Sequence, residues 1–134
     1  METYQCTIAD LSYYQNEKVI SVEVEDNYDS YVMRTTVDGI ELSVTGNGLF
    51  TTFQKLRDEL LKIGFGMKCN AARINAVQSG MMADLDVVYL VELGERASTT
   101  LVNSFWDYAN IDKFPNTEEQ REFADKWFDS ISQS

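Results

Sequence analysis

The sequence predicts an α+β fold, in which a single layer of mostly antiparallel sheet, with about five strands, packs two main helices on one face. Three observations predict it. Apolar and polar residues alternate between positions 18 and 44, apolar residues recur at steps of three and four from position 49 to 63, and helical spacing returns after position 117. Alternation is typical of half-buried strands and the longer step of amphipathic helices. Strands grouped ahead of the helices favour an antiparallel sheet.

The length of the chain suits one hydrophobic core. With 134 residues, of which 44% are hydrophobic, a domain is expected to bury roughly two-thirds of its unfolded surface without disulfides or metal ions. We therefore expect residues 1–134 to form a single α+β domain.

The first predicted strand covers residues 18 to 25, where Ile20, Val22 and Val24 alternate with polar residues. This pattern indicates one buried face and one solvated face. Residues 1 to 17 have two interpretations at this point: they pack as an edge strand, or they lack regular structure.

A hairpin is predicted next, because Asp38-Gly39 separates alternating runs at residues 31 to 37 and 40 to 44. Asp-Gly is a strong signal for a two-residue turn. Such a turn fixes the register of the two strands. The expected pairs on the core face are Val37 with Ile40, Thr35 with Leu42, and Met33 with Val44.

The first helix is predicted from residue 49 to residue 63, and it ends at Gly64, a residue type common after helices. Burying its apolar stripe would contribute on the order of 10 kcal/mol before opposing costs, whereas each surface ion pair adds a few tenths of a kcal/mol. Packing therefore fixes this helix. The stripe consists of Leu49, Phe53, Leu56, Leu60 and Ile63.

The elements expected in the second half are shorter. They are a strand at residues 65 to 70, a loop at 75 to 82, a central strand at 85 to 93, and a short helix at 98 to 109 capped by Ser98. A final helix is predicted to begin after Pro115, because Thr117-Glu118-Glu119-Gln120 matches a capping box. Its expected inner stripe is Phe123, Trp127 and Ile131.

The charge balance restricts the partners of this chain. Twenty-two acidic residues against eleven basic ones give a net charge of −11. Such a surface has little cationic charge to contact the phosphates of a nucleic acid. A basic protein partner fits it, although high negative charge is also a common means of keeping a protein soluble.

The chain contains no histidine. This excludes Ser-His-Asp and Cys-His catalysis and the usual zinc sites. The carboxylates Asp84, Asp86 and Glu92 lack the spacing of a calcium loop, and we expect them to form a solvated strand edge. The sequence therefore predicts no catalytic residue, no metal site and no cofactor, and the prediction leans away from an enzyme.

Cysteine use and hydropathy indicate a compartment. Cys6 and Cys69 form no C-x-x-C pair, so we expect reduced thiols. The first residues show no signal-peptide pattern, and the longest apolar run, residues 87 to 91, is too short to span a bilayer. These patterns predict a cytoplasmic protein without a membrane segment.

A family resemblance covers about residues 46 to 131. Its residues are Leu49-Phe50, Leu56-Arg57, Leu60, Gly64, Cys69-Asn70-Ala71-Ala72-Arg73, Ser79-Gly80-Met81 and Glu118-Glu119-Gln120. The pattern L-F…L-R-x-x-L…C-N-x-A-R…S-G-M resembles that of a group of small uncharacterised bacterial proteins. The resemblance implies a bacterial or phage-related origin and a shared fold. It implies no activity, because no function is known for the group.

The stretch between Glu59 and Asp84 carries no acidic residue, and candidate chemistry gathers there. Its candidate ligand-binding residues are Cys69, Asn70, Arg73, Ser79 and Gly80. A thiolate beside an arginine would be nucleophilic, and a guanidinium with a backbone amide would hold a small anion. The preferred interpretation is structural: the asparagine and the arginine satisfy backbone carbonyls of a long crossover and tie it to the Ser-Gly turn.

A second candidate is the aromatic cluster of Phe105, Trp106 and Tyr108. Aromatic side chains on an irregular segment are typical anchors of a partner interface. Large rings also often close one end of a small core. Both interpretations are open from the sequence.

Three functional hypotheses follow. The first is a non-enzymatic protein-interaction module of a bacterial cytoplasm, of the immunity or inhibitor type, with a basic partner such as a nuclease toxin. The second is a small-ligand, anion-binding or thiol-dependent protein that uses the Cys69–Arg73 and Ser79–Gly80 region. The third is an assembly subunit that forms a homodimer through the aromatic cluster.

Overall fold

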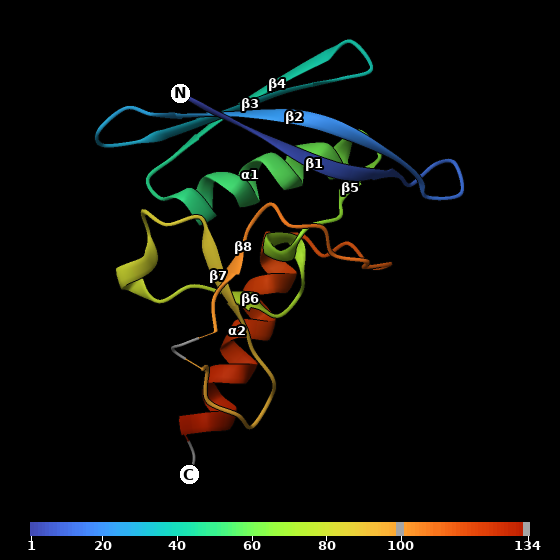
Figure 1. The fold of residues 1–134 in the computed structure, drawn as a ribbon. Coiled ribbons are helices and arrows are strands. Elements are labelled where there is room, and N and C mark those ends of the chain that lie inside the picture. Colours follow the sequence, from blue (N-terminus) through green and yellow to red (C-terminus); the bar gives the residue numbers. More distant parts are fainter. Residues whose placement is uncertain (99–100, 133–134) are drawn as a thin grey trace.

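The computed structural model describes residues 1–98 and 101–132. Within these residues the fold is α+β, with a five-stranded antiparallel sheet of order β4-β3-β2-β1-β5, a three-stranded sheet of order β6-β7-β8, and two α-helices (Figure 1). The elements in chain order are β1 (Glu2–Asp10), β2 (Asn16–Asp26), β3 (Tyr31–Val37), β4 (Ile40–Gly46), α1 (Leu49–Lys62), β5 (Phe65–Met67), the 3₁₀ turn η1 (Asn70–Ala72), β6 (Ala76–Val77), the 3₁₀ turn η2 (Gly80–Met82), β7 (Val87–Leu90), β8 (Asn103–Ser104) and α2 (Thr117–Ser132).

The start of the chain forms an inner strand of the main sheet. Strand β1 pairs with β2 from Glu2 opposite Val24 to Asp10 opposite Asn16, and it pairs with β5 on its other side. It is therefore not at an edge, because the later strand β5 covers it. Sequence reasoning had no signal for a partner that arrives more than fifty residues further along the chain.

The predicted hairpin is confirmed with its register. Val37 lies opposite Ile40, and the ladder continues to Tyr31 opposite Gly46. Ile40 is expected on the core face from the sequence but is 45% exposed, because it lies next to the turn on the edge strand β4. The two turn residues, Asp38 and Gly39, have φ values of 51° and 80°. Two successive positive φ values are the requirement of the turn type that matches the twist of a hairpin.

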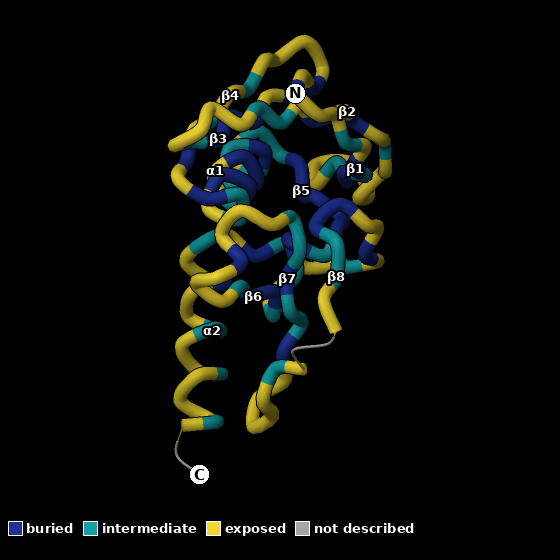
Figure 2. The backbone as a smooth tube through the Cα atoms, turned by 60° about the vertical axis from the view of Figure 1, so that its left-hand side comes forward, coloured by how far each residue is buried: buried dark blue, intermediate teal, exposed yellow. Residues whose placement is uncertain are grey.

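The first helix is confirmed as well. Helix α1 lies across one face of the main sheet (Figure 1), and its side chains Phe53, Leu56 and Leu60 are fully buried. Gly64 follows it with a φ of 92°, a conformation that glycine adopts without strain. Buried segments run along α1 and β5, whereas most of α2 is exposed (Figure 2).

The second half differs from the sequence-based expectation in three ways. The predicted loop at 75 to 82 contains the short strand β6 and the turn η2. Strand β7 is central, as predicted, but in a separate small sheet between β6 and β8. The predicted helix at 98 to 109 is wrong over its described part, residues 101–109, which contains β8 and no helix; residues 99–100 lie outside the described residues. The backbone there pairs across the chain instead, since Phe105 N donates to Asp86 O at 2.9 Å and Ala109 N donates to Lys68 O at 3.1 Å.

Helix α2 is confirmed, with a different cap. Asn116 and Glu119 satisfy each other's backbone N–H groups, at 2.9 and 3.0 Å, so the reciprocal cap lies one residue earlier than predicted. Gln120 is thereby free to point into the protein, where it is 2% exposed. The helix lies on the same side of the main sheet as α1 and extends away from it (Figure 1). Neither described helix has the length and apolar character needed to cross a bilayer.

Candidate functional site: an acidic groove

Cys69 is not placed as a nucleophile. It follows β5, is fully buried, and forms a backbone bridge with Tyr108. Its nearest neighbour of interest is Cys6, which is also buried, and both are free thiols. A hydrogen bond with Cys69, and then burial, raise the pKa of the Cys6 thiol. A substrate would reach either sulfur only after the fold opens locally.

Asn70 and Arg73 have the structural role that the sequence favours, but toward a different neighbour. Asn70 donates to Ser104 O at 3.1 Å, and Arg73 Nε donates to Asn70 Oδ1 at 3.2 Å. These bonds therefore attach the segment after β5 to β8. They do not attach it to the Ser79–Gly80 turn, the neighbour expected from the sequence.

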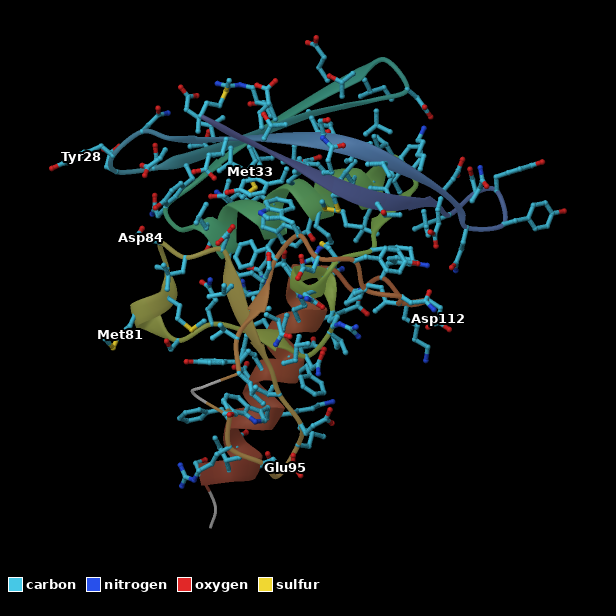
Figure 3. All side chains as sticks on the ribbon, viewed as in Figure 1. Tyr28, Met33, Met81, Asp84, Glu95 and Asp112 are labelled. Atoms are coloured by element: carbon cyan, nitrogen blue, oxygen red, sulfur yellow. The ribbon has the colours of Figure 1, made fainter. Side chains whose placement is uncertain are left out.

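Ser79 and Gly80 are both exposed and begin η2. The end of that turn contacts the start of α1, where Leu49 N donates to Ala83 O at 2.9 Å. Met81, which follows Gly80, points outward into solvent (Figure 3). The predicted ligand-binding residues are thus divided: Asn70 contacts β8, whereas the turn that begins with Ser79 and Gly80 contacts α1.

Arg57 and Gln120 form a buried polar connection that sequence reasoning missed. Arg57 is 1% exposed, and its Nη2 donates to Gln120 Oε1 at 2.7 Å. The Gln120 amide nitrogen donates to Ala71 O at 2.9 Å and to Arg73 O at 2.7 Å. One side chain of α2 therefore links α1 to the segment after β5.

Asp58 completes this connection. Its Oδ1 accepts from Arg57 Nε at 2.8 Å and from Thr117 N, at the start of α2, at 3.1 Å. Burial lowers the pKa of Arg57, and Asp58 opposes that effect. Arg57, Gln120 and the segment from Ala71 to Arg73 are thus joined by hydrogen bonds.

The aromatic cluster is divided between core and surface. Phe105 is fully buried and Trp106 is 8% exposed, so both belong to the core, whereas Tyr108 is 51% exposed. The prediction that Phe105 and Trp106 present an interface is therefore corrected for Phe105, whose ring packs 5.8 Å from that of Phe53. The two rings close the core, which is the second interpretation that the sequence allowed.

A groove of about 490 Å³ lies at the end of the molecule where β1 begins and β2 ends. We call it the acidic groove. It is lined by Met1, Glu2, Tyr4, Val24, Glu25, Asp26, Tyr31, Leu49, Asp84, Leu85, Asp86 and Trp106. Five of these side chains are carboxylates, and they come from β1, from the end of β2 and from the loop before β7.

Aromatic rings form one wall of the acidic groove. Tyr4 stacks on Trp106, with ring centroids 5.1 Å apart and planes 12° from parallel. Trp106 is the one ring of the predicted cluster that reaches this groove. Its indole nitrogen is buried, and among the described residues it has no hydrogen-bond partner.

The pKa values of two tyrosine hydroxyls in the groove are raised by the neighbouring carboxylates. Tyr31 donates to Asp84 Oδ1 at 2.7 Å, and this hydrogen bond, followed by burial and the nearby carboxylates, raises the pKa of Tyr31 to about 12. Tyr4 donates to Glu2, which together with burial and Asp86 raises the pKa of Tyr4 well above its usual value. A phenolate is disfavoured in both places because the groove is already negative.

Exposed side chains continue from the groove. Asp26, Tyr28, Tyr31 and Asp84 border an adjoining hollow. Tyr28 is fully exposed at the tip of the β2–β3 turn, with a φ of 78°. Tyr28 and Met81 point away from the body on the same side of the molecule as Asp84 (Figure 3). Tyrosine, tryptophan and methionine are side chains that partner interfaces use.

The carboxylates are spread along the groove and do not converge. Within residues 1–98 and 101–132, no group of three or more Cys, Asp or Glu side chains is placed to hold a metal ion. A spread of negative charge beside aromatic rings matches an extended cationic surface instead. From the sequence, Asp84 and Asp86 are expected to form a solvated strand edge. Glu2 and Tyr31 could not be placed beside them, because these residues are distant in the sequence.

No protein-family model and no curated protein matches this chain.

Proposed function

We propose that this chain is a non-enzymatic protein-interaction module of the immunity or inhibitor type, and that the acidic groove docks a basic segment of its protein partner. The observation that carries the proposal is the meeting of five carboxylates with the Tyr4–Trp106 stack in one groove. A bacterial cytoplasm is the compartment that the proposal assumes.

Lysine and arginine side chains fit this groove by two kinds of contact. The carboxylates Asp84 and Asp86 offer acceptors for charge-assisted hydrogen bonds. The Tyr4 ring, which is half-buried where it stacks on Trp106, attracts a cation. A phosphate backbone would be repelled by the same carboxylates, so a nucleic acid does not fit this site.

The charge of the whole chain supports the same partner. A net charge of −11 raises the rate at which a basic protein reaches the surface. Tyr28 and Leu85, both exposed beside the groove, would supply apolar area that a partner covers on docking.

The alternative function, binding of a small ligand or anion, is supported by one observation. The hollow concerned includes Arg73 but not the predicted Ser79–Gly80 turn. Arg73 and Lys113 line a hollow of about 450 Å³ with the apolar side chains of Ile111, Phe114 and Pro115, and the carboxylates Asp112 and Glu119 line it too. The hollow suits an amphipathic ligand that carries both a carboxylate and a cationic group. Its test is the loss of binding of such a ligand in Arg73→Gln. The thiol-dependent version has no support from the structure, because Cys69 is buried.

The proposal is tested by titrating a synthetic peptide of alternating arginine and serine into the protein and measuring heat. The test variant is the double substitution Asp84→Lys with Asp86→Lys, in the groove. The control is Glu122→Lys with Asp125→Lys, which makes the same change of net charge on exposed positions of α2.

We expect the groove variant to weaken peptide binding by about tenfold or more and the control by about twofold, because local contacts add to general attraction. Equal weakening by both variants would show that net charge alone binds the peptide and would contradict the proposal. Asp84→Asn with Asp86→Asn serves if the lysine variant does not fold.

A further inference from the structure

Cys6 lies on β1, and Cys69 follows the neighbouring strand β5 by two residues. The β1–β5 ladder pairs Asp10 with Phe65 and Ile8 with Met67. One further backbone bond, from Lys68 N to Thr7 O at 2.8 Å, extends the same register. The next position places Cys6 directly across from Cys69.

Opposed residues in an antiparallel ladder alternate between pairs that exchange backbone hydrogen bonds and pairs that do not, and the Cα atoms are closer in the second kind. Lys68 N donates to Thr7 O, and Leu11 N donates to Gly64 O at 2.9 Å, so the backbone bonds of this ladder fall on odd-numbered positions, Thr7 in β1 and Leu11 directly after it. Cys6 therefore belongs to a pair that exchanges no backbone bonds, for which the Cα atoms are about 4.5 Å apart. A disulfide accepts Cα separations of roughly 4.4 to 6.8 Å.

Both side chains point to the same side. Cys6 and Cys69 lie on the core face with Ile8 and Met67, and both are buried and free. The raised pKa of Cys6, caused first by its hydrogen bond with Cys69, agrees with contact between the two sulfur groups. Neither cysteine lines the acidic groove.

We propose that Cys6 and Cys69 form a cross-strand disulfide when the protein meets a small-molecule disulfide oxidant, and that this bond joins β1 to the segment after β5. The inference goes beyond the proposed function and does not depend on it. The sequence predicts two separate reduced thiols, whereas this inference makes the two cysteines one site of oxidation.

The reaction balances with oxidised glutathione as the oxidant. One cysteine thiolate attacks a glutathione sulfur, which forms a mixed disulfide and releases one reduced glutathione. The second cysteine thiolate attacks the protein-bound sulfur, forms the Cys6–Cys69 bond and releases the second glutathione. The protein loses two electrons and two protons, and both are recovered in the two glutathione thiols.

Access to the sulfurs requires a local opening. Strand β5 contributes three ladder pairs at an edge of the main sheet, so its pairing with β1 can open locally while the β3–β4 hairpin stays paired. Closing the bond would then fix Cys69, whose neighbour Asn70 N donates to Asp107 O at 3.1 Å, relative to the strand that carries Tyr4. Oxidation is expected to stabilise the attachment of the segment after β5 to the middle of β1.

The test equilibrates the whole chain with mixtures of reduced and oxidised glutathione, in buffer and in strong urea. We expect native protein to lose the mass of two hydrogen atoms, to yield a proteolytic fragment that links Cys6 to Cys69, and to melt about 10 °C higher than reduced protein. The equilibrium constant for the bond should be roughly 100-fold or more larger in buffer than in urea.

Two controls make the result decisive. Cys6→Ser and Cys69→Ser should each take up a single glutathione and show no rise in melting temperature. Native protein that accumulates glutathione adducts without the linked fragment would overturn the proposal. An equilibrium constant no larger in buffer than in urea would overturn it too, because the fold would then not favour the pair. Both measurements use the unsubstituted chain, so they stand even if a serine variant does not fold.

Discussion

Replacing Gln120 by methionine tests whether the buried polar connection between α1 and α2 holds the second half of the fold. Glutamine and methionine have similar length and similar helix propensity, so Gln120→Met removes hydrogen bonds while keeping most of the packing. The side chain is 2% exposed, and water cannot replace the lost partners without opening the site.

The expected cost follows from the groups left without partners. Ala71 O loses its bond from Gln120, and Arg57 Nη2 keeps only Thr117 Oγ1, at 3.2 Å. Arg73 O is less affected, because Ala76 N still donates to it at 3.2 Å. A buried unsatisfied group costs about 1–3 kcal/mol, and more when it is charged. The free energy of unfolding should therefore fall by about 3–5 kcal/mol.

The measurement is urea unfolding followed by circular dichroism. A loss of this size should lower the midpoint by about 2 M urea. Arg121→Met, at the exposed neighbouring position on α2, is the control and should change stability by less than about 0.5 kcal/mol. A loss below about 1 kcal/mol for Gln120→Met would refute the reasoning, because the connection would then contribute no more than a surface contact.

Two further predictions concern packing and titration. Gly66→Ala would place a Cβ atom 2.3 to 2.7 Å from the Phe114 ring, so we expect a loss of about 1–3 kcal/mol in urea unfolding; the same cost in a Phe114→Ala background would contradict the clash. Asp84→Asn removes the carboxylate that raises the pKa of Tyr31 to about 12. That pKa should move toward 10 in a tyrosine absorbance titration, and an unchanged value would show that Asp84 is not its cause. Because the folded state disfavours the Tyr31 phenolate, the stability that this residue contributes is complete below pH 10 and is lost as the pH rises toward 12.

Elements that local physics determines could be predicted from the sequence. The Asp38-Gly39 turn sets the pairing of β3 with β4 through backbone angles that those two residues adopt readily. Helix α1 follows from the spacing of its apolar residues and the glycine after it. In both cases the deciding residues lie within a few positions of one another.

Features that depend on distant pairing could not be predicted. The segment up to Ala109 is predicted as a helix capped by Ser98, but its backbone pairs with Asp86 and Lys68, which lie far from it in the sequence. Gln120 looks like an ordinary polar helix residue until the fold places it against Arg57. The acidic groove is the clearest case, since Glu2, Tyr31 and Asp84 meet only when both sheets are in place.

The central claim is that the acidic groove binds a basic segment, and the two tryptophans test it within one molecule. Trp106 lines the groove, whereas Trp127 lies on α2 and donates from its indole nitrogen to Glu95 O at 2.7 Å. The measurement is the NMR signal of each indole N–H during titration with the arginine–serine peptide. We predict that the Trp106 signal shifts and saturates while the Trp127 signal stays in place. Equal shifts of both signals, or a shift of Trp127 alone, would contradict the claim.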